Sequence, residues 1–98
     1  KLRISASKGQ FFNNGISETT LEAHLFQNNN EVTENYDSEC FLWKRTSFDS
    51  SSDTYWNEQH SEGTKKIAIT RTDVMYGANF SCTFTYNGET ITSLATIK

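Results

Sequence analysis

The sequence contains no proline, only five glycines and two cysteines among its 98 residues, and it has no long apolar run. A membrane-spanning helix needs about 20 consecutive apolar residues, so we expect a soluble domain with no membrane partner. The amino-terminal residues also lack the charged and apolar regions of a signal peptide. Because the chain begins with Lys1 rather than Met, we expect it to come from a longer, multidomain polypeptide.

Basic residues are also scarce, and they are scattered. Nine Lys and Arg stand against 12 Asp and Glu, which gives a net charge of -3. The longest basic runs are the dipeptides Lys44-Arg45 and Lys65-Lys66. A protein that binds the phosphate backbone usually gathers Lys and Arg on one face. The sequence therefore predicts no nucleic-acid partner.

No catalytic or metal-binding constellation can be recognised. His24 and His60 are far apart in the sequence, and no His, Cys and Asp residues have the spacing of metal ligands. No motif of the kind that exposes an activated Ser or Cys nucleophile is present. We therefore expect no enzyme, and we assign no catalytic, cofactor-binding or metal-binding residue and no cofactor.

The residues that are abundant, Thr, Ser and Asn, favour an all-β domain with polar turns. The length of residues 1–98 fits a single domain. Alternating apolar and polar residues indicate strands whose apolar side chains face a common core. The strands expected on this basis are residues 2–6, 19–26, 39–46, 66–71, 78–86 and 89–98.

Asn87-Gly88 is a strong signal for a two-residue hairpin turn, because both residues accept the positive φ that a type I′ turn requires. This turn sets the register of the two strands that it joins. Phe84 then faces Ile91, and Cys82 and Phe80 face Ser93 and Ala95. All of these side chains fall on one face, so turn chemistry and core pattern agree.

The connections carry further signals. Gln10 to Gly15 ends in a turn signal, and either Phe11 or Phe12 is expected to pack against the sandwich edge. Residues 53–60 resemble a short helix that Gly63 would end. Residues 72–77 indicate a corner with a Thr or Asp cap, one helical turn, and Val74 closing the end of the core.

Phe41 and Trp43 on one strand, followed by a corner and an aromatic residue two positions before Cys82, are typical of an immunoglobulin-like sandwich. We expect about seven antiparallel strands, with Trp43 in the middle of the core and a short helix between the C and E strands. Cys40 lies three residues before Trp43, so alternation along one strand places it on the outer face, away from Cys82. We therefore expect both thiols to be free, which points to assembly in a reducing compartment.

Four aromatic side chains are the candidate contacts for a carbohydrate or a protein partner: Tyr36, Phe48, Tyr55 and Trp56. A Tyr-Trp pair on a short helix more often attaches that helix to the sheet, because buried aromatic rings supply much of the packing area of a small domain. Docking to a neighbouring domain through an edge strand is a further alternative.

Several stretches between Ser17 and Lys98 resemble the immunoglobulin-like modules of tail proteins from phages and prophages of Gram-positive bacteria. The resemblance rests on Leu21-x-Ala23-x-Leu25-Phe26, Phe41-Leu42-Trp43, Trp56 to His60 with Gly63, Ile67-x-Ile69, Asp73-Val74, Ala78-x-Phe80-x-Cys82 and Tyr86-Asn87-Gly88. These are fold motifs and fix no binding residue. Cys40 departs from the pattern.

The resemblance implies a non-enzymatic accessory module of a phage tail, baseplate or fibre protein. Such a module acts as a spacer, or attaches weakly to carbohydrate of the host cell envelope. Its partners are then the neighbouring domains of the tail protein, and it is located in a virion assembled in the bacterial cytoplasm. The alternative is a glycan-binding adhesion module of a bacterial surface protein. An exposed Trp56 would favour adhesion, and a buried Trp56 would favour the spacer.

Overall fold

The computed structural model describes residues 1–12 and 16–98 of the chain. Most of its regular structure is β-strand. The elements, in chain order, are β1 (Leu2–Ala6), β2 (Glu18–Gln27), β3 (Asn30–Glu31), the 3₁₀ helices η1 (Thr33–Asn35) and η2 (Ser38–Cys40), β4 (Phe41–Thr46), α1 (Ser50–Gln59), β5 (Lys66–Thr70), α2 (Arg71–Val74), β6 (Ala78–Tyr86) and β7 (Glu89–Ile97).

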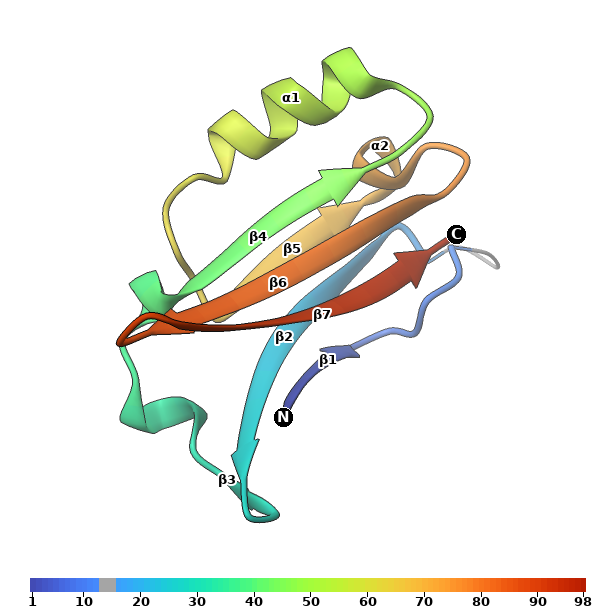
Figure 1. The fold of residues 1–98 in the computed structure, drawn as a ribbon. Coiled ribbons are helices and arrows are strands. Elements are labelled where there is room, and N and C mark those ends of the chain that lie inside the picture. The colour runs from blue at the N-terminus through green and yellow to red at the C-terminus, as the bar shows by residue number, and fades with distance from the viewer. Residues whose placement is uncertain (13–15) are drawn as a thin grey trace.

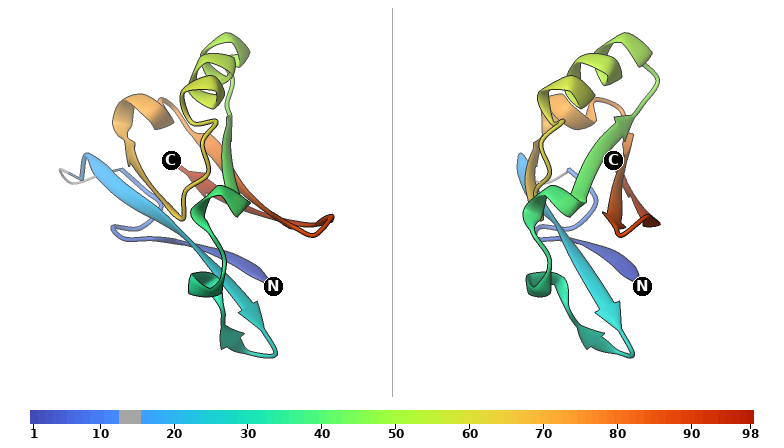
Figure 2. Two further views of the ribbon diagram at one scale, coloured as in Figure 1. Left: turned by 90° about the vertical axis from the view of Figure 1, so that its left-hand side faces the viewer. Right: turned by 60° about the vertical axis from the view of Figure 1, so that its left-hand side comes forward.

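The strands form two antiparallel sheets, an arrangement that is consistent with a β-sandwich (Figures 1 and 2). In one sheet β2 pairs with β1 on one side and with β5 and the short β3 on the other. In the other sheet β6 lies between β4 and β7. Figure 1 shows α1 alongside β4, with α2 near the end of that strand. The predicted mostly β domain, with a short helix between β4 and β5, is confirmed.

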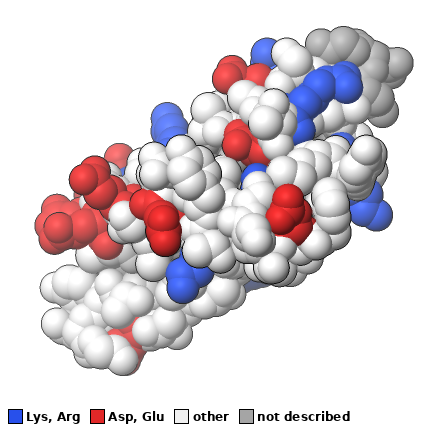
Figure 3. Space-filling view, turned by 90° about the horizontal axis from the view of Figure 1, so that it is seen from above, with Lys and Arg blue, Asp and Glu red and all other residues white. Residues whose placement is uncertain are grey.

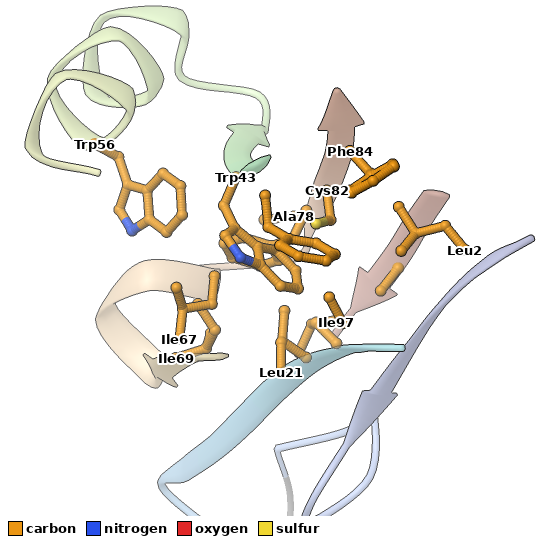
Figure 4. Packing of buried hydrophobic residues seen from close by; sticks show 14 of the residues in the cluster. Leu2, Leu21, Trp43, Trp56, Ile67, Ile69, Ala78, Cys82, Phe84 and Ile97 are labelled. Atoms are coloured by element: carbon orange, nitrogen blue, oxygen red, sulfur yellow. The ribbon is translucent and has the colours of Figure 1, made fainter. Parts of the chain in front are cut away.

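The core lies between the sheets and is centred on Trp43, which is buried together with Phe41 and Phe80 (Figure 4). Leu21 and Ile69 reach it from the opposite sheet. The inward positions predicted from alternation are therefore confirmed for β2, β4 and β6, whereas Ile91 near the start of β7 is exposed. The indole N–H of Trp43 donates to the Thr64 carbonyl at 2.7 Å, so its polar atom is satisfied within the core.

The predicted hairpin register is confirmed at every expected pair. Phe84 faces Ile91, and the two further pairs, Cys82 with Ser93 and Phe80 with Ala95, follow in step. Asn87 and Gly88 have φ angles of 51° and 80°, as a type I′ turn requires. The local turn chemistry therefore fixed nine residues of each strand.

The predicted start of the central strand at Glu39 is wrong. Strand β4 begins at Phe41, and Cys40 ends the 3₁₀ helix η2, so strand alternation does not apply to it. Instead of facing outward, Cys40 is half-buried against the core. Both thiols are free, and burial raises the pKa of Cys82 to about 12, which makes Cys82 a small apolar core residue.

Helix α1 starts earlier than predicted, and Gly63 does not end it. The helix begins after Asp49, whose carboxylate accepts a hydrogen bond from the Ser52 amide at 3.1 Å. Its carboxyl-terminal cap is His60. Gly63 is needed for another reason: a Cβ atom there would lie 2.4 Å from the Cα of Glu39. A side chain at this position would collide with the backbone before β4.

The corner before β6 contains the predicted helical turn, but its cap is Thr70 and not Thr72. Thr70 and Asp73 form a capping box, in which each side chain bonds to the backbone of the other residue. Val74 is buried and closes the end of the core, as predicted. Met75 follows with φ 59° and ψ -116°, a conformation that strains any residue other than glycine.

The segment after β1 reaches the end of β7. Phe12 packs against the core and Phe11 is exposed, in agreement with the expectation that one of them is packed. Gln10 and Phe12 both form backbone hydrogen bonds with Lys98, at 2.8 and 2.6 Å. The turn predicted at Asn13 to Gly15 lies outside the described residues.

Candidate functional site: the surface between α1 and α2

The structure does not bring the four predicted contact residues together. Tyr36 is half-buried and packs edge-on against Phe84 and Tyr86, with ring centroids 5.0 Å apart in each pair. Phe84 faces Phe41, the first residue of β4. Phe48 follows the last residue of that strand, so Tyr36 and Phe48 lie at opposite ends of the sheet.

Trp56 attaches α1 to the rest of the domain. Only 5% of this residue is exposed, and its ring meets Phe80 of β6 at a centroid distance of 5.4 Å. The indole N–H donates to the carboxylate of Asp73 at 3.2 Å, and the ring of His60 stacks on the other side at 3.7 Å. The interpretation that the pair fixes the helix to the sheet is therefore right for Trp56.

Tyr55 points the other way, with 66% of the residue exposed. It lies in a group of exposed side chains that the sequence did not indicate as a group. Phe48, 69% exposed, contacts the ring of Tyr76 at a centroid distance of 5.7 Å. Tyr55 and Met75 line the same cleft, of about 240 Å³, between α1 and α2. We call these four residues, Phe48, Tyr55, Met75 and Tyr76, the α1–α2 surface.

Tyr76 and Met75 are the members that sequence reasoning missed. Tyr76 is 91% exposed and follows the strained Met75. The sequence did contain a signal for their exposure. In the run Val74-Met75-Tyr76 only Val74 can close the core, so the two residues after it are left outside. The contact of Tyr76 with Phe48 depends on the tertiary fold, because 28 positions separate the two residues.

A buried ion pair supports this surface from below. Arg45 faces inward on β4 and is 3% exposed. Its Nε donates to the carboxylate of Asp53 on α1 at 2.8 Å, and further guanidinium N–H groups donate to the Asp73 carbonyl and the Ser52 hydroxyl. The ion pair thus ties β4, α1 and the corner together, and holds the two sides of the cleft in place.

The environment of Asp53 favours its charged form. Burial raises the pKa of Asp53, but hydrogen bonds from the Ser47 amide and hydroxyl and from Arg45 outweigh this effect, so the pKa lies below its ordinary value. Sequence reasoning missed this pair. Alternation with Phe41 and Trp43 already placed it on the inner face.

Polar groups that line the cleft form hydrogen bonds within the domain. The Asp73 carboxylate that lines it is engaged by Trp56 and by the capping box. Within residues 1–12 and 16–98, no group of three or more His, Cys, Asp or Glu could hold a metal ion. In the same residues no helix is long and apolar enough to cross a membrane.

Charge is unevenly distributed around this side of the domain. Viewed from above, Asp and Glu side chains are most densely gathered toward one end, and further acidic side chains lie among uncharged surface in the middle (Figure 3). Asp37, Glu39 and Glu62 line a shallow hollow between η2 and the segment after α1. The α1–α2 surface is distinguished from this hollow by its exposed aromatic rings.

Comparison with known proteins adds no relative: no family model, no curated protein and no solved structure matches this chain.

Proposed function

We propose that this chain is an immunoglobulin-like accessory module of a phage tail, baseplate or fibre protein, and that it serves mainly as a spacer between neighbouring domains. The strand order supports the fold assignment. One sheet contains β1, β2 and β5 and the other contains β4, β6 and β7, which corresponds to strands A, B, E and C, F, G of an immunoglobulin-like sandwich. Helix α1 then replaces a strand between C and E.

The burial of Trp56 is the observation that carries the spacer proposal. An aromatic platform for a sugar needs its largest ring at the surface, but Trp56 is packed between Phe80 and His60. The strongest aromatic candidate is therefore used to hold the domain together. A spacer needs this kind of internal rigidity and no dedicated site.

Weak attachment to carbohydrate of the host cell envelope is the second candidate, and the α1–α2 surface favours it. Tyr55 presents an aromatic ring to solvent beside the cleft, and Tyr76 presents one next to Phe48. Aromatic rings pack well against the C–H faces of sugars. Such a surface would serve equally well in a phage fibre or in an adhesion module of a bacterial surface protein.

A pull-down on whole Gram-positive cells and on isolated cell walls distinguishes the two. Trp56→Ala is unsuitable as a probe because the loss of a buried Trp unfolds or loosens the domain. Tyr55→Ala and Tyr76→Ala remove exposed rings, and Tyr86→Ala removes a half-exposed ring at the opposite end as the matched control.

The spacer proposal predicts that the wild-type domain does not bind cells or walls. Binding that Tyr55→Ala and Tyr76→Ala abolish, and that Tyr86→Ala retains, would replace it with attachment through the α1–α2 surface. Binding that all three variants retain would contradict both proposals.

A further inference from the structure

Strand β7 forms a long free edge of the second sheet. In a two-residue hairpin, the residues flanking the turn bond to each other, so Glu89 and every second residue after it direct their backbone groups to β6. Thr90, Thr92 and Leu94 therefore direct their N–H and C=O groups away from β6. Lys98 continues this alternation, because its outward N–H and C=O bond to Gln10 and Phe12.

Among the strands that the structure describes, none other takes up these outward groups. Strand β1 of the other sheet lies against β7, but in the described part of the chain no backbone hydrogen bond reaches residues 90–96 from it. The segment that contains Gln10 and Phe12 closes only the end of the edge, at Lys98. Residues 90–96 are left open.

The sequence of β7 itself also lacks the usual protection against pairing with another chain, although β1 lies alongside the strand. Natural edge strands carry Lys, Pro or a bulge, or are very short. Strand β7 has nine residues in continuous pairing with β6, and Glu89 is its only charged residue. Its outward face consists of threonines and Leu94, which is 62% exposed. The shorter edge strands β1 and β5 carry Arg3 and Lys66.

We propose that β7 pairs with β7 of a second copy of this chain, antiparallel and about a two-fold axis at Thr92, so that the two three-stranded sheets become continuous. Two-fold dimers are the commonest closed assemblies, and they need one self-complementary patch. Thr90, Thr92 and Leu94 each donate one backbone hydrogen bond to the second copy and accept one from it. This inference is independent of the proposed function.

The register follows from the two ends of the edge. With the axis at Thr92, the partner's Gly88 lies opposite Thr96, where the partner's chain turns back through its hairpin. The partner's strand therefore ends before Lys98, whose outward groups are already bonded. An axis one residue later would place the hairpin on the segment that binds Lys98.

Side chains in this register are compatible with one another. Leu94 lies opposite the partner's Thr90, and Ile91 lies opposite the partner's Ser93. Cross-strand contacts therefore reduce the exposure of the two apolar side chains. Glu89, the single charge, lies opposite the partner's Ala95 rather than another carboxylate. No like charges oppose each other across the axis.

The test is sedimentation equilibrium of the full chain over a wide range of concentration, with two variants. Thr92→Pro removes an outward N–H and leaves the backbone hydrogen bonds to β6 intact, because the Thr92 backbone does not bond to that strand. It also removes the exposed side-chain hydrogen bond between Thr92 and Thr83 of β6, 3.0 Å long. Thr85→Lys adds a charge to the same outer face, one strand away from the edge, and serves as the control. Thermal unfolding verifies that each variant is folded.

We expect the wild-type mass to rise from monomer toward dimer and no further, Thr85→Lys to behave in the same way, and Thr92→Pro to remain monomeric while folded. Three results would overturn the proposal. These are a wild-type chain that is monomeric at every concentration, association that Thr92→Pro retains, and growth beyond the dimer.

Discussion

The two edges of the β4-β6-β7 sheet are treated in opposite ways. At the β4 edge, the side chain of Asn57 on α1 bonds to both the N–H and the C=O of Arg45, at 2.7 and 3.4 Å. The Thr64 amide donates to the Phe41 carbonyl at 2.9 Å. At the β7 edge, residues 90–96 have no such partner among the described residues. The helix closes one edge of the sheet and leaves the other available.

Helix α1 therefore stabilises the fold and also limits how the domain can associate. Substitutions at the β4 edge should reduce the stability of the monomer and leave association unchanged. Substitutions at the β7 edge should reduce association and leave the stability of the monomer unchanged.

Asp53→Ala should have the largest effect. It leaves the buried Arg45 guanidinium without its carboxylate, and breaking a buried ion pair in this way costs about 3–5 kcal/mol. Urea unfolding monitored by Trp fluorescence measures the loss. Glu58→Ala, an exposed acidic residue on the same helix, is the control and should change stability by less than about 0.5 kcal/mol. Equal losses in the two variants would show that Arg45 does not depend on Asp53.

Acid should weaken the same ion pair. Because the pKa of Asp53 is lower in the folded state, its contribution to stability is complete above the unfolded pKa of about 4 and is lost as the pH falls through the folded value. The loss should be smaller than in Asp53→Ala, since a protonated carboxyl group still forms hydrogen bonds. Unfolding free energies from about pH 7 to about pH 3, compared with Asp53→Asn, measure it. The difference in unfolding free energy between the wild type and Asp53→Asn should become smaller as the pH falls. A difference that stays constant would contradict the lowered pKa of Asp53.

Asn57→Ala should open the β4 edge at Arg45. It leaves the Arg45 N–H and C=O groups without a side-chain partner in a partly buried position, at a cost of about 1–3 kcal/mol. Chemical unfolding gives the stability, and sedimentation should show the same monomer–dimer equilibrium as the wild type. A loss of association would mean that the β4 edge, and not the β7 edge, binds the second copy.

Thr92→Lys should have the smallest effect on stability, within about 0.5 kcal/mol, because the residue is exposed and its backbone does not bond to β6. It should nevertheless prevent pairing, since two lysines would meet at the two-fold axis. Unfolding curves and sedimentation of one sample give both quantities. A large loss of monomer stability would show that Thr92 has a structural role that the fold does not indicate.

The sequence predicted the elements that local chemistry determines. Asn87-Gly88 fixes a turn whose geometry allows one register, so the pairs of β6 and β7 followed directly. Alternation also placed Trp43 in the core. The same alternation places Arg45 on the inner face, where no partner for its charge could be recognised from the sequence.

The candidate site was less predictable because it depends on packing between distant segments. The partner of Arg45 could not be named from the sequence, since Asp53 meets it only where α1 packs on β4. The contact between Phe48 and Tyr76 likewise requires the loop after β4 and the corner after β5 to meet. Cys40 was misplaced because η2 interrupts the strand pattern just before Phe41.

Residue-resolved amide hydrogen exchange, measured at low and at high protein concentration, tests the contrast between the two edges most directly. The account predicts that the Arg45 amide is protected at both concentrations, because Asn57 accepts its hydrogen bond within the monomer. The Thr92 amide should exchange freely when dilute and become protected when concentrated. A Thr92 amide that is protected in the dilute monomer, or that exchanges equally fast at both concentrations, would contradict it.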